Sequence, residues 1–268
     1  MARTLGKIFK SSYLGLMLLF LYAPIFLLIL FSFNNSKTPG NWVGFTLHWY
    51  RDLVRNTTIT DAIWVTLTIA LVSSIVATVL GTCAAIGLHA MKRRNRVIIE
   101  NVSQLPIMNP DLVTGVSLAL LFLAVGLRGG YIRLLIAHIT FNIPYVLFSV
   151  MPRLRASSNA LYEAALDLGC TPGQALRKVI IPDIWPSILS GFILAFTLSL
   201  DDFVISFFAG NGVDNLSMYI FSAAKRGVNP ALSTIIFVPV VTLLLIVNLR
   251  SIRKEREEER RERRLSNK

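Results

Sequence analysis

The sequence predicts an all-α membrane protein with six transmembrane helices and one long helical loop. Three observations support this fold class: 54% of the residues are hydrophobic, the mean hydropathy is +0.60, and the charged residues gather between long uncharged stretches. Only 16% of the residues are charged, against about 25% in a typical soluble domain. The chain has two cysteines, Cys83 and Cys170, too few for a disulfide-stapled secreted scaffold.

Six uncharged stretches have about the length, roughly 20 residues, that an α-helix needs to cross a bilayer. None shows the alternation of a membrane β-strand. The third and fifth reach full length only if residues beside an aspartate are included. The first is too long for a signal peptide and precedes no small-x-small cleavage site, so we expect a retained helix. The predicted spans are 13–33, 62–90, 105–127, 132–151, 185–208 and 229–249.

The orientation follows from the lysines and arginines. Twenty of them lie on the side of the N-terminus, and 7 lie on the other side. Because cytoplasmic loops carry the excess of positive charge, both termini are predicted to be cytoplasmic. The net charge of +12 is then a topology signal, and no base-reading module indicates nucleic-acid binding. We expect one multi-pass transmembrane domain over residues 1–268; the family resemblance described below implies that its membrane is a bacterial inner membrane.

The first loop on the opposite side of the membrane is rich in aromatic residues. Aromatic side chains near a span commonly anchor it at the membrane interface. A short interfacial helix that also contacts an outside partner is the alternative. The residues concerned are Trp42, Phe45, Trp49 and Tyr50.

Motifs for catalysis and cofactor binding are absent from the sequence. It contains no phosphate-binding P-loop and no GxSxG, HExxH or CxxC pattern. The histidines, His48, His89 and His138, lie on three separate segments without metal-ligand spacing. His138 falls within a predicted span, where a polar contact between helices is favoured over a transport role. We expect no catalytic residue, metal or cofactor in this chain.

The loop over residues 152–184 is predicted to form a helix–turn–helix. Asn159 is a suitable N-cap for a first helix, and Gly169 a suitable left-handed residue at its end. Thr171 is then placed to cap a second helix, which we expect Pro182 to stop.

This loop resembles the EAA loop of binding-protein-dependent ABC importer permeases, whose usual pattern is EAA-x3-G-x9-I-x-L-P. Val179 and Ile181 stand where the family usually has Ile and Leu. The resemblance implies a type I ABC importer permease fold, with a loop that docks on a cytoplasmic ATPase. The docking residues that it implies are Glu163, Ala164, Ala165, Gly169 and Pro182.

Other segments resemble the permeases of spermidine/putrescine importers. They are MNPDLV (108–113), AHITFNIPYV (137–146), LSLDDFVISFF (198–208) and RGVNPAL (226–232). Permeases for iron, thiamine or phosphonates share the EAA loop, so these substrates stay open. A stand-alone secondary transporter is the alternative from another class, and it would leave the EAA loop unexplained.

The resemblance also implies a set of partners. They are a second permease subunit in a heterodimer, two ATPase subunits that bind ATP and Mg²⁺, an extracytoplasmic solute-binding protein, membrane lipid and a polyamine substrate.

Two adjacent carboxylates, Asp201 and Asp202, fall near the far end of the fifth predicted span. An ionised carboxylate in mid-bilayer costs roughly 2.5–3.5 kcal/mol, so such residues usually face a cavity or a partner. We expect at least one of them to line the substrate pathway and attract a polyamine. The alternatives are an ion pair with Lys or Arg of a neighbouring helix, or a position beyond the hydrocarbon.

Asp111 follows Asn109 and Pro110. This order suggests an N-cap, an N1 proline and an acid at the positive end of a helix. A capping role is favoured over substrate contact, which the family resemblance keeps open. The charged tail over 250–268 is expected to form a solvated helix, with anionic lipid binding as the alternative.

Overall fold

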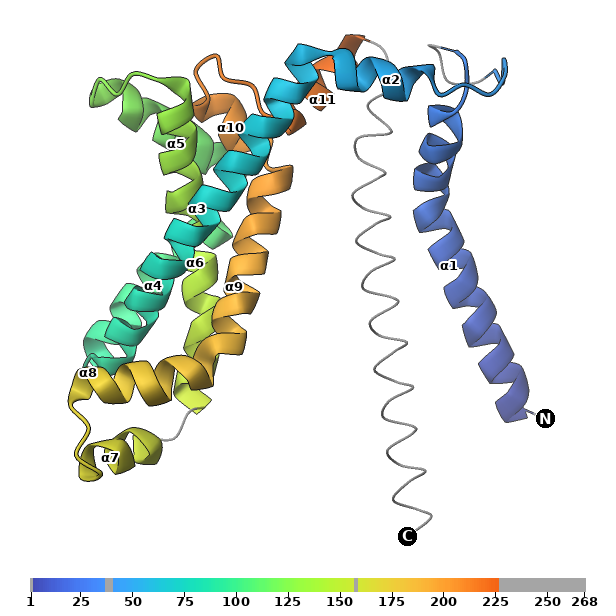
Figure 1. Ribbon diagram of the computed structural model, residues 1–268. Coiled ribbons are helices and arrows are strands. Elements are labelled where there is room, and N and C mark those ends of the chain that lie inside the picture. The colour runs from blue at the N-terminus through green and yellow to red at the C-terminus, as the bar shows by residue number, and fades with distance from the viewer. Residues whose placement is uncertain (1, 37–40, 157–158, 227–268) are drawn as a thin grey trace. The chain divides into compact units, whose positions relative to one another are not determined.

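The computed structural model describes residues 2–36, 41–156 and 159–226, and these residues form helices without a β-strand. One isolated antiparallel bridge joins Asn34 to Phe45. The chain divides into two compact units, residues 58–221 and the segments that precede and follow them. All-α architecture is therefore confirmed for the described part of the chain (Figure 1).

Four helical segments are long and apolar enough to cross a membrane, and a bent pair of helices raises the number to five in the described residues. The four are Tyr13–Ser32 within α1 (Ala2–Ser32), α3 (Thr57–Ala90), α6 (Gly130–Ala156) and the helical path Pro172–Asp201. The sixth predicted span, 229–249, and the tail, 250–268, lie outside the described residues.

The third predicted span, 105–127, is not one helix. α4 (Arg93–Met108) and α5 (Asp111–Ala124) meet at a bend of 103°. Pro110 takes the N-cap position of α5 without a side-chain hydrogen bond, and Asn109 ends α4 instead of capping α5. The expected cap is therefore wrong, because Asn109 belongs to the preceding helix. Asp111 is the first residue of α5.

The aromatic loop after α1 folds back on itself around Asn34. The side chain of Asn34 accepts a hydrogen bond from the Val43 backbone N–H at 2.8 Å, and its main-chain oxygen accepts one from Trp49 Nε1 at 2.9 Å. Phe33 stacks on Phe45 with ring centroids 5.5 Å apart. Trp49, the second residue of the short helix α2 (His48–Arg55), is buried, whereas Trp42 is exposed. The four aromatic residues therefore do not share one role.

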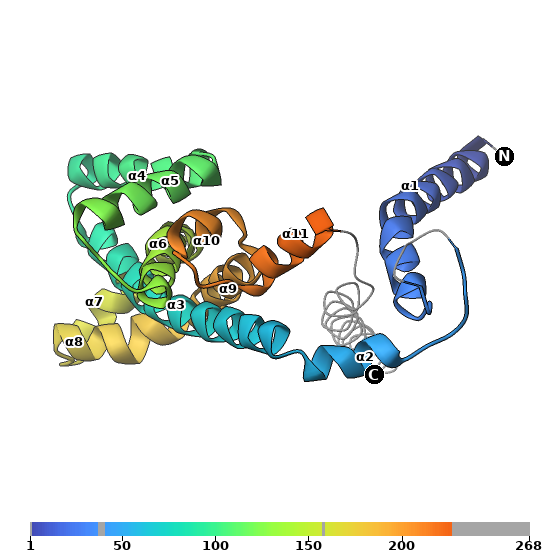
Figure 2. The ribbon, with the colours of Figure 1, turned by 90° about the horizontal axis from the view of Figure 1, so that it is seen from above.

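The larger unit is built around α6, which α3, α9 (Ile181–Asp201) and α10 (Val204–Ala209) surround (Figure 2). Two glycines let α3 and α9 approach it closely. A Cβ placed on Gly81 would lie 2.8 Å from Cβ of Val146, and one on Gly191 would lie 3.3 Å from Cγ1 of the same valine. Small residues at such crossings are typical of helices packed in membranes.

The loop after α6 begins with α7 (Asn159–Asp167), which starts at the residue predicted as its cap. Gly169 has a φ of +86°, so the predicted left-handed turn is confirmed. Thr171 caps α8 (Pro172–Ala175) in a capping box with Gln174, also as predicted. The chain then stays helical through one π turn (Leu176–Ile180) into α9.

Pro182 does not stop this second helix, contrary to the prediction. It lies in the first turn of α9, directly after the π turn. A proline is tolerated in the first turn of a helix, so the helix continues through this position. The loop and the predicted fifth span are thus one helical path. α11 (Leu216–Arg226) is the last described helix.

Candidate functional site

The acidic pair marks a break in the predicted fifth span, 185–208. α9 ends at Asp201, and α10 begins at Val204. The Asp202 carboxylate accepts hydrogen bonds from the backbone N–H groups of Ile205 at 3.2 Å and Ser206 at 2.8 Å. The first N–H groups of a helix have no partner within it, so Asp202 supplies one for α10.

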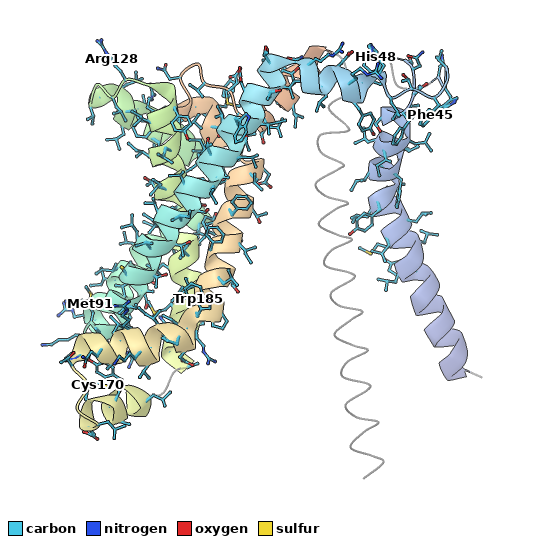
Figure 3. The ribbon with its side chains drawn as sticks, viewed as in Figure 1. Phe45, His48, Met91, Arg128, Cys170 and Trp185 are labelled. Carbon is cyan, nitrogen blue, oxygen red and sulfur yellow. The ribbon has the colours of Figure 1, made fainter. Side chains whose placement is uncertain are left out.

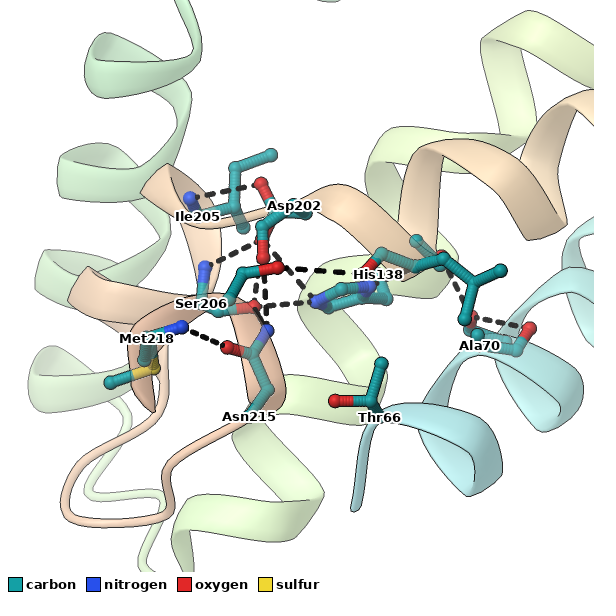
Figure 4. Close-up of polar contacts among 12 residues, drawn as sticks. Thr66, Ala70, His138, Asp202, Ile205, Ser206, Asn215 and Met218 are labelled. Atoms are coloured by element: carbon teal, nitrogen blue, oxygen red, sulfur yellow. Dashed lines mark hydrogen bonds and ion pairs between the residues drawn. The ribbon is translucent and has the colours of Figure 1, made fainter. Parts of the chain in front are cut away.

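A group of hydrogen-bonded polar side chains surrounds Asp202, and we call it the polar cluster (Figure 4). His138 of α6 is its centre. Its Nδ1 lies 3.1 Å from Ser199 Oγ, and its Nε2 lies 3.0 Å from Ser206 Oγ and 3.5 Å from Asp202 Oδ2. The members are Ser73, His138, Asn142, Ser199, Asp202, Ser206 and Asn215.

The cluster joins segments that lie far apart in the sequence. Ser199 Oγ accepts a hydrogen bond from Asn142 Nδ2 at 2.7 Å and lies 3.2 Å from Ser73 Oγ of α3. Asn215 Nδ2 lies 2.8 Å from Ser206 Oγ and 2.9 Å from the main-chain oxygen of Asp202, donating to both. Four helices and the segment before α11 thus meet through hydrogen bonds at the α9–α10 break.

Burial separates the two aspartates. His138, Asn142 and Ser206 are fully buried, and the Asp202 side chain is only 8% exposed. Among the described residues Asp202 pairs with no Lys or Arg, so the expected ion pair with such a residue is absent there. The predicted interhelical role of His138 is confirmed. Asp202 therefore has the contacts of a structural residue, whereas Asp201 is exposed.

Asp111 begins α5 and Asp201 ends α9 just before α10, so the two carboxylates lie on elements that meet at α10 although 90 residues separate them in sequence. α5 packs on α10, and a Cβ on Gly115 of α5 would lie 3.3 Å from Cα of Ile205. Asp111 and Asp201 are exposed and form no salt bridge within the described residues. Two neighbouring carboxylates without a cation favour binding of a positively charged solute.

No set of three or more metal-ligating side chains occurs in the described part of the chain.

The residues of the helical loop differ in accessibility. Glu163, Ala164 and Gly169 are exposed, whereas Ala165 is buried at 7% exposure and packs within the loop. Leu168, beside the turn, is 86% exposed. Pro182 is exposed in the first turn of α9. Ala165 therefore offers less surface to a partner than Glu163, Ala164 and Gly169, and docking of these residues stays a prediction.

Comparison with known proteins places the chain in a family. Residues 77–253 match the binding-protein-dependent transport system inner membrane component family. The spermidine/putrescine transport system permease protein PotC of Escherichia coli K12 is 35% identical over 256 residues, which cover 94% of this chain and 96% of PotC. The putrescine transport system permease protein PotI of the same strain is 41% identical over 228 residues, 81% of each chain.

Solved structures show the same fold. A chain of a bacterial ABC transporter involved in the import of the acidic polysaccharide alginate has a TM-score of 0.76 at 14% identity, covering 94% of this chain and 97% of that chain. A chain of the MetNI methionine ABC transporter has a TM-score of 0.60 at 19% identity, covering 78% and 96%. The chain belongs to the family of inner membrane components of binding-protein-dependent transport systems.

Proposed function

We propose that the chain is the permease subunit of an ATP-driven importer and forms half of a translocation pathway for polyamines. The 35% identity to the E. coli spermidine/putrescine permease over 94% of the chain carries this proposal. The neighbouring, exposed carboxylates of Asp111 and Asp201 support it, because a polyamine carries several ammonium groups. Transport proceeds by alternating access, in which the pathway opens first to one side and then to the other.

Asp201 and Asp111 are the cation contacts in this proposal. Both are exposed, Asp201 at the α9–α10 break and Asp111 at the start of α5, which packs on α10. Asp202 takes part indirectly, because its carboxylate is occupied by α10 and Ser206.

The loop around Gly169 docks on an ATPase subunit in this proposal. Glu163, Ala164 and Gly169 provide exposed contact surface. Ala165, which is buried, and Pro182, which is exposed at the start of α9, shape the helices beside them. The other partners are a second permease, a second ATPase and an extracytoplasmic binding protein, within the lipid of an inner membrane. ATP and Mg²⁺ bind to the ATPase subunits, so this chain does no hydrolysis.

Orientation is the second part of the proposal. Cys170 and Arg128 lie at opposite ends of the larger unit (Figure 3). The distribution of basic residues favours a cytoplasmic loop around Cys170 and an external loop around Arg128.

Uptake by the reconstituted importer tests the function. Proteoliposomes containing the chain, its partner permease and the ATPases, supplied with binding protein, should accumulate spermidine or putrescine only when ATP is present. Thiamine, iron and phosphonates serve as competitors. ATP-dependent uptake of one of these instead would reassign the substrate. Uptake by this chain alone would indicate a secondary transporter.

Cysteine labelling tests the orientation. In whole cells, Asn211→Cys in a chain with Cys83→Ala and Cys170→Ala should react with a membrane-impermeant thiol reagent. Leu168→Cys in the same background should react only after the cells are opened. The reverse pattern would invert the topology.

A further inference from the structure

Two ion pairs lie where the helical loop joins the membrane helices, and we call their four residues, Glu100, Arg153, Arg155 and Asp183, the neck. Arg153 Nη2 lies 2.6 Å from Asp183 Oδ1, and its Nε donates to the main-chain oxygen of Asp183 at 3.4 Å. Arg153 lies before α7 in the sequence, and Asp183 lies after α7, α8 and the π turn. This pair therefore joins the two ends of the loop.

The second pair attaches the same segment to a different helix. Arg155 Nη2 lies 2.6 Å from Glu100 Oε1 of α4. Glu100 is buried at 8% exposure, and Arg96 Nε lies 3.9 Å from the same carboxylate oxygen. A carboxylate buried to this degree is held by its cations, so the position of α4 depends on Arg155.

The side chains of the two arginines leave α6 in nearly opposite directions. They are two residues apart, which is about 200° around a helix. Leu154, between them, is buried in the apolar core that Met151 and Ile184 share. The end of α6 is therefore fixed to α9 on one side and to α4 on the other, so its movement shifts both neighbours.

Both neighbours lead to the candidate cation contacts. α9 runs from Asp183 to Asp201, and α4 is followed after its bend by Asp111, the first residue of α5. The neck thus links the loop to the two helical segments that carry the exposed carboxylates.

We propose that the neck is the mechanical coupling element of the importer. Arg153 and Arg155 are positioning residues, which convert displacement of the loop by the ATPase into movement of the segments that carry Asp111 and Asp201. This inference rests on the proposed function, and it concerns the amount of substrate imported per ATP hydrolysed.

Exposure makes the proposal testable without large losses of stability. The side chains of Arg153 and Arg155 are each 51% exposed, and an ion pair of mainly exposed side chains, such as Arg153–Asp183, contributes little to folding. The partner of Arg155, Glu100, is buried, so Arg155 is best replaced together with Glu100. Such a link can still transmit force, since the Arg153 guanidinium contacts both the side chain and the main chain of Asp183 and so fixes direction as well as distance.

The first test measures spermidine imported per ATP hydrolysed by the complete importer in proteoliposomes. Arg153→Gln should lower this ratio at least threefold with an unchanged amount of assembled complex, and Arg155→Gln should lower it as much in the complex that assembles. Arg155→Lys should retain most of the ratio, because it keeps one charged hydrogen bond. The double variant Glu100→Gln, Arg155→Gln should import less spermidine per ATP hydrolysed, and it leaves no buried carboxylate unpaired.

Arg94→Gln is the matched control, because Arg94 is exposed on the same helix as Glu100 and forms no ion pair within the described residues. An equal loss in Arg94→Gln would indicate a general charge effect and overturn the proposal. Failure of every neck variant to assemble would also overturn it, since the neck would then be structural alone.

The second test needs no polyamine. Spin labels at Leu120 of α5 and Ile193 of α9, both exposed, report the spacing of the two segments in a chain with Cys83→Ala and Cys170→Ala. ATP binding should change this spacing in the wild-type complex and change it less in Arg155→Gln. An equal change in both would contradict the coupling role. If the spacing changes less in Arg155→Gln but the complex imports no polyamine, the result would contradict the assignment of polyamines as substrate and still support the coupling role.

Discussion

The polar cluster and the neck both join α6 to neighbouring helices, but they do so with different chemistry. The cluster is buried and consists mainly of neutral hydrogen-bonding groups around one carboxylate, Asp202. The neck consists of ion pairs whose arginine side chains are half exposed. A buried polar group that loses its partner is costly, whereas an exposed ion pair contributes little. The cluster should therefore determine whether the protein folds, and the neck how efficiently it works.

The largest expected effect follows from removing the carboxylate of the cluster. Asp202→Ala leaves the first N–H groups of α10 and the Ser206 hydroxyl without their acceptor. Loss of a helix cap together with buried unpaired donors should cost roughly 2–4 kcal/mol. The yield of folded protein and its midpoint of thermal unfolding in detergent should both drop. Asp201→Ala is the control, and equal unfolding midpoints in the two variants would contradict a structural role for Asp202.

A smaller loss is expected at the turn of the loop. Gly169→Val places a β-branched residue at a φ of +86°, which costs about 1–2 kcal/mol for a non-glycine residue. An added Cβ meets no atom within 4 Å there, so the effect comes from the backbone alone. The ATPase should be retained less well in pull-down, and uptake should fall. Gly173→Ala, at a helical glycine with equally open space, should leave both unchanged.

The smallest of the stability effects is expected at the centre of the cluster. His138→Phe keeps a ring but removes both nitrogens that contact Ser199 and Ser206. Hydrogen bonds between membrane helices contribute about 0.6 kcal/mol each on average, so the loss should be about 1 kcal/mol. Thermal unfolding measures it. Thr140→Val on the same helix is the control, because Thr140 bonds only its own helix. A loss as large for this control would remove His138 from the stabilising contacts.

The local signals in the sequence were strong enough to predict four of the spans and the turn of the loop. Gly169 and Thr171 have conformational preferences that act within a few residues, so their geometry followed from the sequence. The prediction that Pro182 ends the second helix of the loop was wrong, because a proline in the first turn of a helix looks the same in sequence as one that ends a helix.

The site depended on contacts between distant residues, which no local pattern contains. Ser73 and Asn142 meet Ser199, and Asn215 meets Asp202, only after α3, α6 and the segment before α11 have packed. A serine or asparagine inside a span is too common to mark a site alone. The sequence did place Ser206 four residues after Asp202, which was the one local signal of their contact. It offered no means of deciding which aspartate is buried.

Transport kinetics of two asparagine variants test the central claim, that Asp201 meets the polyamine while Asp202 holds the fold. Spermidine uptake by the reconstituted importer is measured against concentration and normalised to assembled complex. Asp201→Asn should raise KM about tenfold, which corresponds to about 1.4 kcal/mol of lost interaction, with assembly unchanged. Asp202→Asn should reduce the amount of assembled complex but leave KM near the wild-type value. A wild-type KM in Asp201→Asn, or a raised KM confined to Asp202→Asn, would contradict the account.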